Sequence, residues 1–245
     1  MNPASRAQRD AQGDAQGDKG DTDEGQPHMR RTAVVFARAP RLGTVKRRLA
    51  RTIGDRAALR FHTETLTGLL RRLTRRRDFR TVLAWTPDKA RDRLAVRVAR
   101  IAQGRGDIGE RMDRACRRYP RGAVAIVGSD IPEANAADLR AAFRLLGSHD
   151  AVFGPAADGG YWLVALGTRR PARPFAGGRW STEHALADTL RNFKGFRVAF
   201  LRTLRDVDTA DDLPRPARAC DPHAHPRRSP RKLAPRKPAP RKTET

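Results

Sequence analysis

Three aspartates in this sequence stand where carboxylates could bind a divalent cation. Asp130 follows the apolar run AVAIV at residues 123–127, and Pro132 comes two residues later. Such a run is typical of a buried parallel strand, and ligands of open α/β sheets bind just beyond the carboxyl ends of the strands. Asp206 and Asp208 alternate in RDVDTADDL, so both would face one side of an extended chain. Because Mg²⁺ is usually held by one or two carboxylates and substrate phosphates, these positions predict a Mg²⁺ or Mn²⁺ site beside a diphosphate.

Each of these acids also has a purely structural explanation. Asp130 could cap the helix that follows it. Asp208 or Thr209 could cap a helix that begins at Ala210, where acids in the first turn would favour the helix dipole. Capping explains about two of the four aspartates in RDVDTADDL, residues 205–213. In so basic a chain, the remaining acids favour a cation site.

A second group of residues has the composition of a phosphate-binding loop. Residues 37–49, ARAPRLGTVKRRL, connect a predicted strand to a predicted helix. Gly43 permits close approach of the backbone, and free N–H groups at a helix start suit a phosphate. Lys46 and Arg48 add positive charge. The loop lacks the Gly-Lys-Ser/Thr ending of a P-loop and the GxGxxG dinucleotide motif, and a plain connector with surface cations would look similar.

Two further motifs offer polar groups. DGGY at residues 158–161 has two glycines that could let a ligand lie against the backbone, although the sequence is also typical of a tight turn. WST at residues 180–182 offers hydroxyls and N–H groups to an anion, or an ordinary helix cap. The six histidines have no metal-ligand spacing, and the chain contains neither GxSxG nor HExxH.

The elements that would position these motifs alternate between strands and helices. Strands are predicted at residues 32–37, 81–85, 98–103, from 123, at 151–156, 161–166 and 196–201. Helices are predicted from residue 45, from Asp55 as cap to about Arg77, near 88–95, after a capping box of Asp107 and Glu110, over 135–146, and from Ser181 or Thr182 to about Arg191. This order predicts a layered α/β domain with a mostly parallel sheet. The short connection between 151–156 and 161–166 predicts one antiparallel strand.

Composition bounds the rest of the molecule. The 245 residues suffice for one domain, predicted at 30–213, between disordered segments at 1–29 and at the Pro/Arg/Lys-rich 214–245. No apolar run is long enough to span a membrane, and there is no secretory signal. Two cysteines form no disulfide framework, which favours a cytoplasmic protein. The net charge of +24 suggests nucleic-acid binding as one function. The arginines are dispersed along the chain, however, and aromatic residues make up only 6%, which argues against that function.

Six motifs, in this order, resemble a bacterial family of glycosyltransferase-A-fold transferases. The family is labelled radical-SAM/selenodomain-associated transferase 1 or arsenosugar-biosynthesis-type glycosyltransferase, within the nucleotide-diphospho-sugar transferase superfamily. The motifs are FARAPRLGTVKRRL, QGRGDIGERM, VGSDIP, GPAADGGYWL, WST and DVDTADDL, over about residues 31–213. The resemblance implies a three-layer α/β/α glycosyltransferase-A (Rossmann-like) fold with a mostly parallel mixed sheet.

The resemblance also implies a role for each motif. The nucleotide diphosphate would contact Arg38, Gly43, Lys46 and Arg48, and the base or ribose would border Gln103, Gly104 and Gly109. Asp130 would bind the metal, with Asp206 and Asp208. The acceptor side would comprise Asp158, Gly159, Gly160, Trp180, Ser181 and Thr182. This chain has arginine, leucine and arginine at positions 38, 42 and 47, where the family usually has lysine, proline and threonine.

These observations lead to three functional hypotheses. The first is a glycosyltransferase that uses Mg²⁺ or Mn²⁺ to move a sugar from a nucleoside diphosphate sugar to a small-molecule acceptor, which Asp158 orients or deprotonates. The second is a nucleotidyltransferase of the guanylyltransferase type, which would join an NMP from an NTP to a phosphorylated metabolite held at WST. The third is a basic polyanion-binding protein with a degenerate transferase domain.

Overall fold

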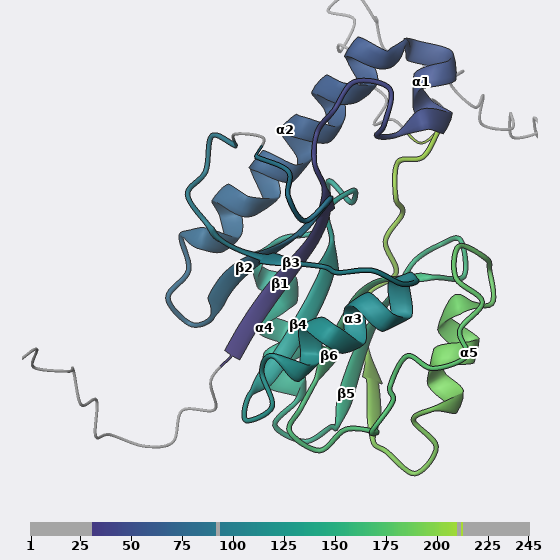
Figure 1. The fold of residues 1–245 in the computed structure, drawn as a ribbon. Coiled ribbons are helices and arrows are strands. Elements are labelled where there is room, and N and C mark those ends of the chain that lie inside the picture. The colour runs from purple at the N-terminus through teal and green to yellow at the C-terminus, as the bar shows by residue number, and fades with distance from the viewer. Residues whose placement is uncertain (1–30, 92–93, 210–211, 213–245) are drawn as a thin grey trace, which may run out of the picture.

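The computed structural model describes residues 31–91, 94–209 and 212 of the chain, and Figure 1 shows their arrangement. This part contains one seven-stranded sheet and five α-helices. The strands are β1 (Arg31–Arg38), β2 (Arg80–Thr86), β3 (Ala99–Ala102), β4 (Ala123–Gly128), β5 (Ala151–Pro155), β6 (Tyr161–Leu166) and β7 (Val198–Phe200). The helices are α1 (Arg47–Ile53), α2 (Asp55–Thr74), α3 (Ile108–Arg117), α4 (Ala136–Leu145) and α5 (Ala185–Arg191).

The sheet is covered by helices on both faces. Alternate residues of the central strands divide between two apolar clusters, as the period of two in a strand requires. Val35 on β1 belongs to the cluster that includes residues of α2 and α4. Val34 belongs to the cluster that includes residues of α3, and Leu186 and Leu190 of α5 pack against that cluster. In Figure 1, α3 accordingly lies in front of the sheet and α4 behind it. The predicted three-layer fold with a mostly parallel mixed sheet is confirmed.

The strand order fixes where a ligand can bind. The order is β3-β2-β1-β4-β6-β5-β7, and β6 runs antiparallel to both of its neighbours, as the short connection between β5 and β6 predicted. The chain runs from β1 outward through β2 to β3 and then returns to place β4 on the other side of β1. The connections after β1 and β4 therefore diverge at the carboxyl edge of the sheet. Such a topological switch point is where open α/β sheets form a binding crevice.

Three predictions about helices need correction. The prediction of a helix near 88–95 is wrong. The described residues there include a turn at 88–89, and the Trp85 indole nitrogen donates to the carbonyl of Ala90 at 3.2 Å. Asp55 does not cap α2. It is the first helical residue, and Gly54, at φ +83°, occupies the cap position. The helix from Ala210 lies outside the described residues.

The start of α5 is the third correction. The helix begins at Ala185 rather than after Ser181 or Thr182, and His184 occupies its cap position. Ser181 has φ +61°, a left-handed conformation, and residues 181–184 form turns and a bend before the helix begins. The predicted segments 1–29 and 214–245 lie outside the described residues. Among the described residues, no helix has the length and apolar character needed to cross a bilayer.

Candidate active site

Asp130 lies just beyond the carboxyl end of β4, at the switch point. Its neighbours Ser129 and Ile131 are buried, whereas Asp130 stands in the bend after the strand, is half-buried and lines the crevice. Gly128 leaves room for the carboxylate, because a Cβ at that position would lie 3.1 Å from Asp130 Oδ1. The absence of a side chain at Gly128 therefore leaves space for the Asp130 carboxylate at the end of the strand.

Asp206 and Asp208 come from the segment after β7, 76 and 78 residues further along the chain. Val207 between them is 4% exposed and packs in a cluster with Leu49 of α1 and Ala58 of α2. Because side chains alternate in extended chain, burying Val207 sends both acids to the opposite side. The predicted common face of the two aspartates is therefore present, and a single apolar anchor holds it.

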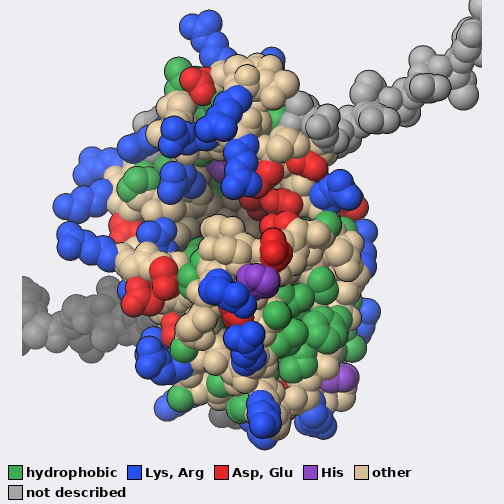
Figure 2. Space-filling view, turned by 90° about the vertical axis from the view of Figure 1, so that its right-hand side faces the viewer, with side chains coloured by type: hydrophobic (Ala, Val, Ile, Leu, Met, Phe, Trp, Pro, Cys, Tyr) green, Lys and Arg blue, Asp and Glu red, His purple; other side chains and the backbone are tan. Residues whose placement is uncertain are grey.

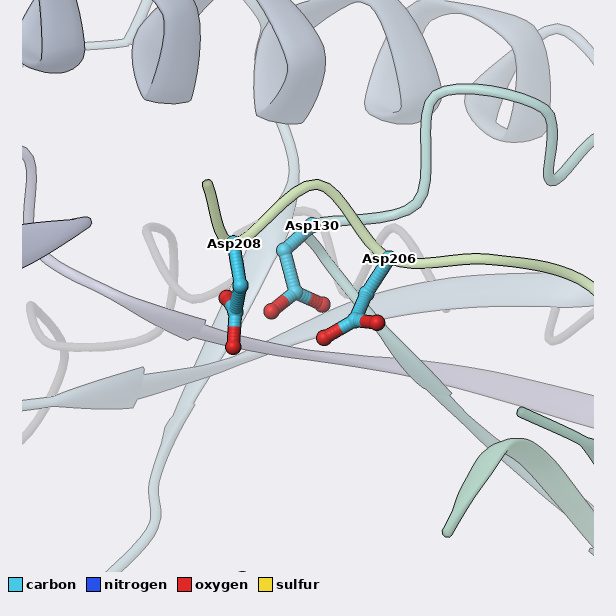
Figure 3. A group of neighbouring side chains, drawn as sticks. All are labelled: Asp130, Asp206 and Asp208. Atoms are coloured by element: carbon cyan, nitrogen blue, oxygen red, sulfur yellow. The ribbon is translucent and has the colours of Figure 1, made fainter. Parts of the chain in front are cut away.

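The three aspartates converge. One carboxylate oxygen from each lies within 4.8 Å of the others, and Figure 3 shows the three carboxylates side by side. Burial and the carboxylates of Asp208, Asp130 and Asp158 raise the pKa of Asp206. Such a concentration of negative charge favours a bound cation. A set of carboxylate oxygens alone suits a hard cation such as Mg²⁺ or Mn²⁺.

Lys46 provides positive charge inside this acidic group. Its Nζ donates to Asp208 Oδ1 at 2.9 Å and to Asp130 Oδ2 at 3.1 Å, and its side chain is 7% exposed. Burial works against its charged form, but the two carboxylates outweigh burial and raise the pKa of Lys46. Its backbone is left-handed, with φ +46°. Strained backbone of this kind clusters at functional sites.

A cavity of about 480 Å³ opens on the side of the crevice next to the first loop. It is lined by Arg38, Lys46, Arg47 and Arg48, together with Asp130 and Asp208. Arg38 donates to the carbonyl of Thr44 at 3.3 Å, which links the two ends of the loop. The predicted basic loop and the carboxylates of Asp130 and Asp208 therefore line the same cavity. Gly43 does not line that cavity; its φ of +71° lets the loop turn.

A second cavity, of about 330 Å³, lies on the other side of Asp130. It is lined by Asp158, Gly160, Trp180, Ser181 and Thr182, which the resemblance places on the acceptor side, and by Asp130 and Asp206. The half-buried Tyr161 adds aromatic surface, and Trp162 also lines the cavity but is only 3% exposed. The two cavities share Ile108, Gly128 and Asp130. Asp130 is therefore the acid that borders both spaces.

The DGG turn and the WST segment lie together because of one glycine. Gly159 has φ +85°, and a Cβ there would lie 2.3 Å from the backbone oxygen of Glu183. Its own carbonyl accepts from Leu186 N at 3.2 Å. Gly159 was predicted to let a ligand lie against the backbone. In the structure, the space that its missing side chain leaves is filled by the backbone of Glu183. In the same turn, Asp158 Oδ1 accepts from Gly160 N at 2.9 Å.

The QGRG loop contributes less directly than expected. Gln103 is 4% exposed, and its Nε2 donates to the carbonyls of Ala37 and Ala84, at 3.2 and 2.9 Å. It therefore ties the ends of β1 and β2 together beneath the crevice. Gly109 is buried where a Cβ would collide with Trp180. Gly104 lines a third cavity, of about 530 Å³, beyond the end of β2.

Two residues of the site were missed from the sequence. His62 of α2 lines the first cavity, and its Nε2 lies 3.0 Å from the carbonyl of Arg38. Burial lowers its pKa. It falls on the apolar stripe of α2, where its spacing is that of a core residue. Ile108 borders both cavities and is 36% exposed. The capping box at Asp107 was the available signal, because it fixes Ile108 as the first residue of α3.

The two cavities differ in the charge of their linings. Figure 2 shows acidic side chains gathered near the middle of one face, with Lys and Arg side chains both above and below them and a hydrophobic patch lower on the same face. The first cavity holds four Lys and Arg residues beside Asp130 and Asp208, and the second holds Asp130, Asp158 and Asp206 with aromatic side chains. The cations of the first cavity suit a phosphate group.

Comparison with known proteins agrees with this geometry. Residues 69–182 match the family described as "Uncharacterized protein conserved in bacteria (DUF2064)". The chain is similar to the crystal structure of a candidate nucleotide-diphospho-sugar transferase from Desulfovibrio desulfuricans G20. That similarity has 28% identity and a TM-score of 0.70, over 75% of this chain and 84% of that one. No curated protein matches the sequence.

Two other solved structures are more distant. A 4-diphosphocytidyl-2C-methyl-D-erythritol synthase from Anaerococcus prevotii DSM 20548 has 12% identity and a TM-score of 0.49, over 76% of this chain and 95% of that one. A cytidylyltransferase from Leptospira borgpetersenii has 16% identity and a TM-score of 0.47, over 76% and 84%. The family match and the Desulfovibrio structure together support a place for this chain among the nucleotide-diphospho-sugar transferases.

Proposed function

We propose that this chain is a metal-dependent glycosyltransferase that moves a sugar from a nucleoside diphosphate sugar to a small-molecule acceptor. The observation that carries the proposal is the position of Asp130. It borders a cavity lined by cations and a cavity lined by acids and aromatic rings, and it belongs to a triad of carboxylates. The likeness to a candidate nucleotide-diphospho-sugar transferase supports the same conclusion. The narrower radical-SAM- and arsenosugar-associated family remains part of this proposal.

The first cavity is the donor side. Lys46, Arg38 and Arg48 would bind the diphosphate, because cations with fixed geometry make the strongest hydrogen bonds to phosphate oxygens. Asp130, Asp206 and Asp208 would hold Mg²⁺ or Mn²⁺, which when bound stabilises negative charge on the diphosphate. Gln103 supports this side indirectly, by fixing the ends of β1 and β2.

The second cavity is the acceptor side. An acceptor hydroxyl would bond to Asp158 and attack the anomeric carbon of the sugar. A carbon–oxygen bond to the acceptor forms, the bond from the anomeric carbon to the phosphate oxygen breaks, and the nucleoside diphosphate leaves with the electron pair. The hydroxyl proton passes to the Asp158 carboxylate. Lys46 and the loop arginines stabilise the charge that grows on the leaving group.

The test combines a donor screen with one substitution. Sugar nucleotides are incubated with Mn²⁺ or Mg²⁺, and release of nucleoside diphosphate is measured. Asp130→Asn should bind Mn²⁺ and nucleoside diphosphate at least tenfold more weakly, because a ligand charge is lost. Its melting temperature should fall little, because Lys46 keeps Asp208 as an ion-pair partner. Asp78→Asn, which removes a surface acid paired with Arg76, is the control.

Two outcomes would contradict the proposal. Unchanged metal affinity in Asp130→Asn would remove this acid from the site. Release of pyrophosphate from NTPs with phosphorylated acceptors, without any turnover of sugar nucleotides, would instead favour nucleotidyl transfer.

A further inference from the structure

The second cavity restricts the chemistry of the acceptor. Resting on the proposed function, we infer that the acceptor is a neutral or cationic alcohol with an apolar, ring-sized face, and that it carries no phosphate or carboxylate. The inference follows from what lines this cavity: the carboxylate of Asp158 beside those of the proposed metal site, aromatic and aliphatic side chains, and no Lys or Arg among the described residues.

The charge of the lining disfavours an anionic acceptor. Among the described residues, no Lys or Arg lines the second cavity. Arg179 lies next to Trp180 in the sequence, but its guanidinium is directed to Asp188 at 2.8 and 3.0 Å. Arg202 is held by Asp138 at 2.9 Å. With Asp130 and Asp206 holding the metal, Asp158 keeps its negative charge in this cavity, and an acceptor phosphate would face it without a compensating cation from these arginines.

The WST segment offers no substitute for a cation. It was predicted to open a helix and present free N–H groups, but α5 begins at Ala185. The Thr182 hydroxyl donates to the carbonyl of Arg179 at 2.7 Å and accepts from His184 N at 3.3 Å. The Thr182 hydroxyl is therefore already used in this turn, and no helix begins at WST to direct its N–H groups at an anion there.

The aromatic part of the lining is rigidly held. Trp180 packs so closely on Gly109 and Gly178 that a Cβ at either position would lie 2.4 or 2.6 Å from its ring. Trp162 is fixed by a hydrogen bond from its indole nitrogen to the carbonyl of Arg202, at 3.2 Å. A ring-sized apolar face, or an alkylammonium group, packs well on such aromatic surfaces. The glycine neighbours show that the position of Trp180 is built into the fold.

Asp158 supplies the polar contact. Its Oδ1 accepts from Gly160 N, and this bond orients the carboxylate. A hydroxyl or ammonium group of the acceptor would donate to Oδ2. A carboxylate in this place is an acceptor of hydrogen bonds only, so it selects groups that can donate.

The experiment uses the full chain, Mn²⁺ and the sugar nucleotide that supports release of nucleoside diphosphate. Four alcohols of similar size are compared: benzyl alcohol, 4-(aminomethyl)benzyl alcohol, 4-(hydroxymethyl)benzoate and 4-(hydroxymethyl)phenyl phosphate. Binding is measured by saturation-transfer NMR and transfer by mass spectrometry of the product. We expect the neutral and cationic alcohols to bind at least tenfold more tightly than the two anions. Equal or tighter binding of either anion, or binding of none of the four, would overturn the inference.

A substitution tests the role of charge separately. Asp158→Asn keeps an oxygen that can accept from Gly160 N but removes the negative charge. The preference for the cationic over the neutral alcohol should fall at least threefold in this variant, and an unchanged preference would count against the inference. Metal-dependent donor binding is measured in the same samples without any alcohol. Its absence would refute the proposed function, whereas its presence with tight binding of the anionic alcohols would refute only this inference.

Discussion

Lys46 shows how one residue can prepare the site for its ligands. Its ammonium group lies between Asp130 and Asp208, which are parts of the carboxylate triad. A buried lysine without partners would lose its proton, and a group of carboxylates without a cation would repel one another. The two carboxylates therefore raise the pKa of Lys46, and its ammonium group offsets part of their mutual repulsion. In the proposed function, a divalent cation would displace the ammonium from the carboxylates, and the ammonium would turn toward the diphosphate in the adjoining cavity.

Replacing Lys46 with methionine should change the two binding reactions in opposite directions. Mn²⁺ alone should bind roughly fivefold more tightly, because a competing charge worth about 1 kcal/mol is removed. Nucleoside diphosphate in the presence of Mn²⁺ should bind more weakly, by about 1.5–3 kcal/mol, the range for a hydrogen bond to a charged group. Isothermal titration measures both. The control is Lys194→Met, at an exposed position shortly after the end of α5. Changes of the same sign in both titrations would disprove the role of Lys46 as a bridge between Asp130 and Asp208.

At the scale of elements, α5 holds the segment that lines the second cavity through Asp188. This side chain is 2% exposed and is paired with Arg179 at 2.8 Å and Arg191 at 3.0 Å. It also accepts from Arg179 N at 3.1 Å, next to Trp180. The hydrogen bonds from Arg179 hold the pKa of Asp188 far below its ordinary value. The helix therefore fixes the segment that carries Trp180 by ionic as well as apolar contacts.

This arrangement predicts a pH-dependent loss of stability. Because the pKa of Asp188 is lower in the folded state than the unfolded value of about 3.9, its stabilisation is complete above about pH 5 and is lost as the pH falls through the folded pKa. Asp188→Asn should thus melt several degrees below the parent at pH 7, with the difference shrinking below about pH 4. Melting curves from pH 3 to 7 test this. The surface variant Asp78→Asn should show a much smaller difference, and a gap that stays constant down to pH 3 would be inconsistent with the ionic role.

The contact between the DGG turn and the α5 segment gives a third prediction. Gly159→Ala and Gly195→Ala each place alanine at a positive φ, +85° and +83°, at a cost of about 1–2 kcal/mol. Only at Gly159 would the new Cβ meet another chain segment, at 2.3 Å, whereas Gly195 faces open space. We expect Gly159→Ala to lose a further 1–3 kcal/mol, roughly, of unfolding free energy and to lose acceptor-dependent turnover. Equal losses in chemical denaturation would show that close approach does not matter there.

The sequence predicted the elements with strong local signals. Apolar β-branched runs marked the strands, the capping box at Asp107 marked the start of α3, and the alternation of Asp206 and Asp208 indicated their common face. What it could not predict depends on tertiary contacts. Gln103 is a polar residue in a glycine-rich loop, and only the ends of β1 and β2 show why it is buried. Ser181 resembles a cap, but residues 181–184 form a turn in which Thr182 bonds to Arg179 and His184, so the helix begins only at Ala185.

At the scale of the whole molecule, the topology explains why loops distant in sequence share one site. The first loop follows β1 and Asp130 follows β4, and these strands are adjacent and parallel. The segment with Asp206 and Asp208 returns from β7 at the far edge of the sheet, and Val207 anchors it on α1 and α2. The crevice thus receives cations from one side and acids from the other. Neither group would form the site alone.

Removing residues 214–245 separates this site from the net charge of the chain. That segment carries ten of the 51 Lys and Arg residues and two of the 27 acids, while every residue of the carboxylate triad and both cavities lies before it. A chain ending at Leu213 should therefore keep Mn²⁺-dependent turnover of sugar nucleotide within about twofold, whereas any affinity for polyanions should fall and depend less steeply on salt. Steady-state kinetics and salt titrations with heparin measure the two effects. Loss of turnover in a truncated chain that remained folded would make the basic segment part of the donor site. If the full chain bound polyanions but turned over no sugar nucleotide, the hypothesis of a basic polyanion-binding protein would replace that of a transferase.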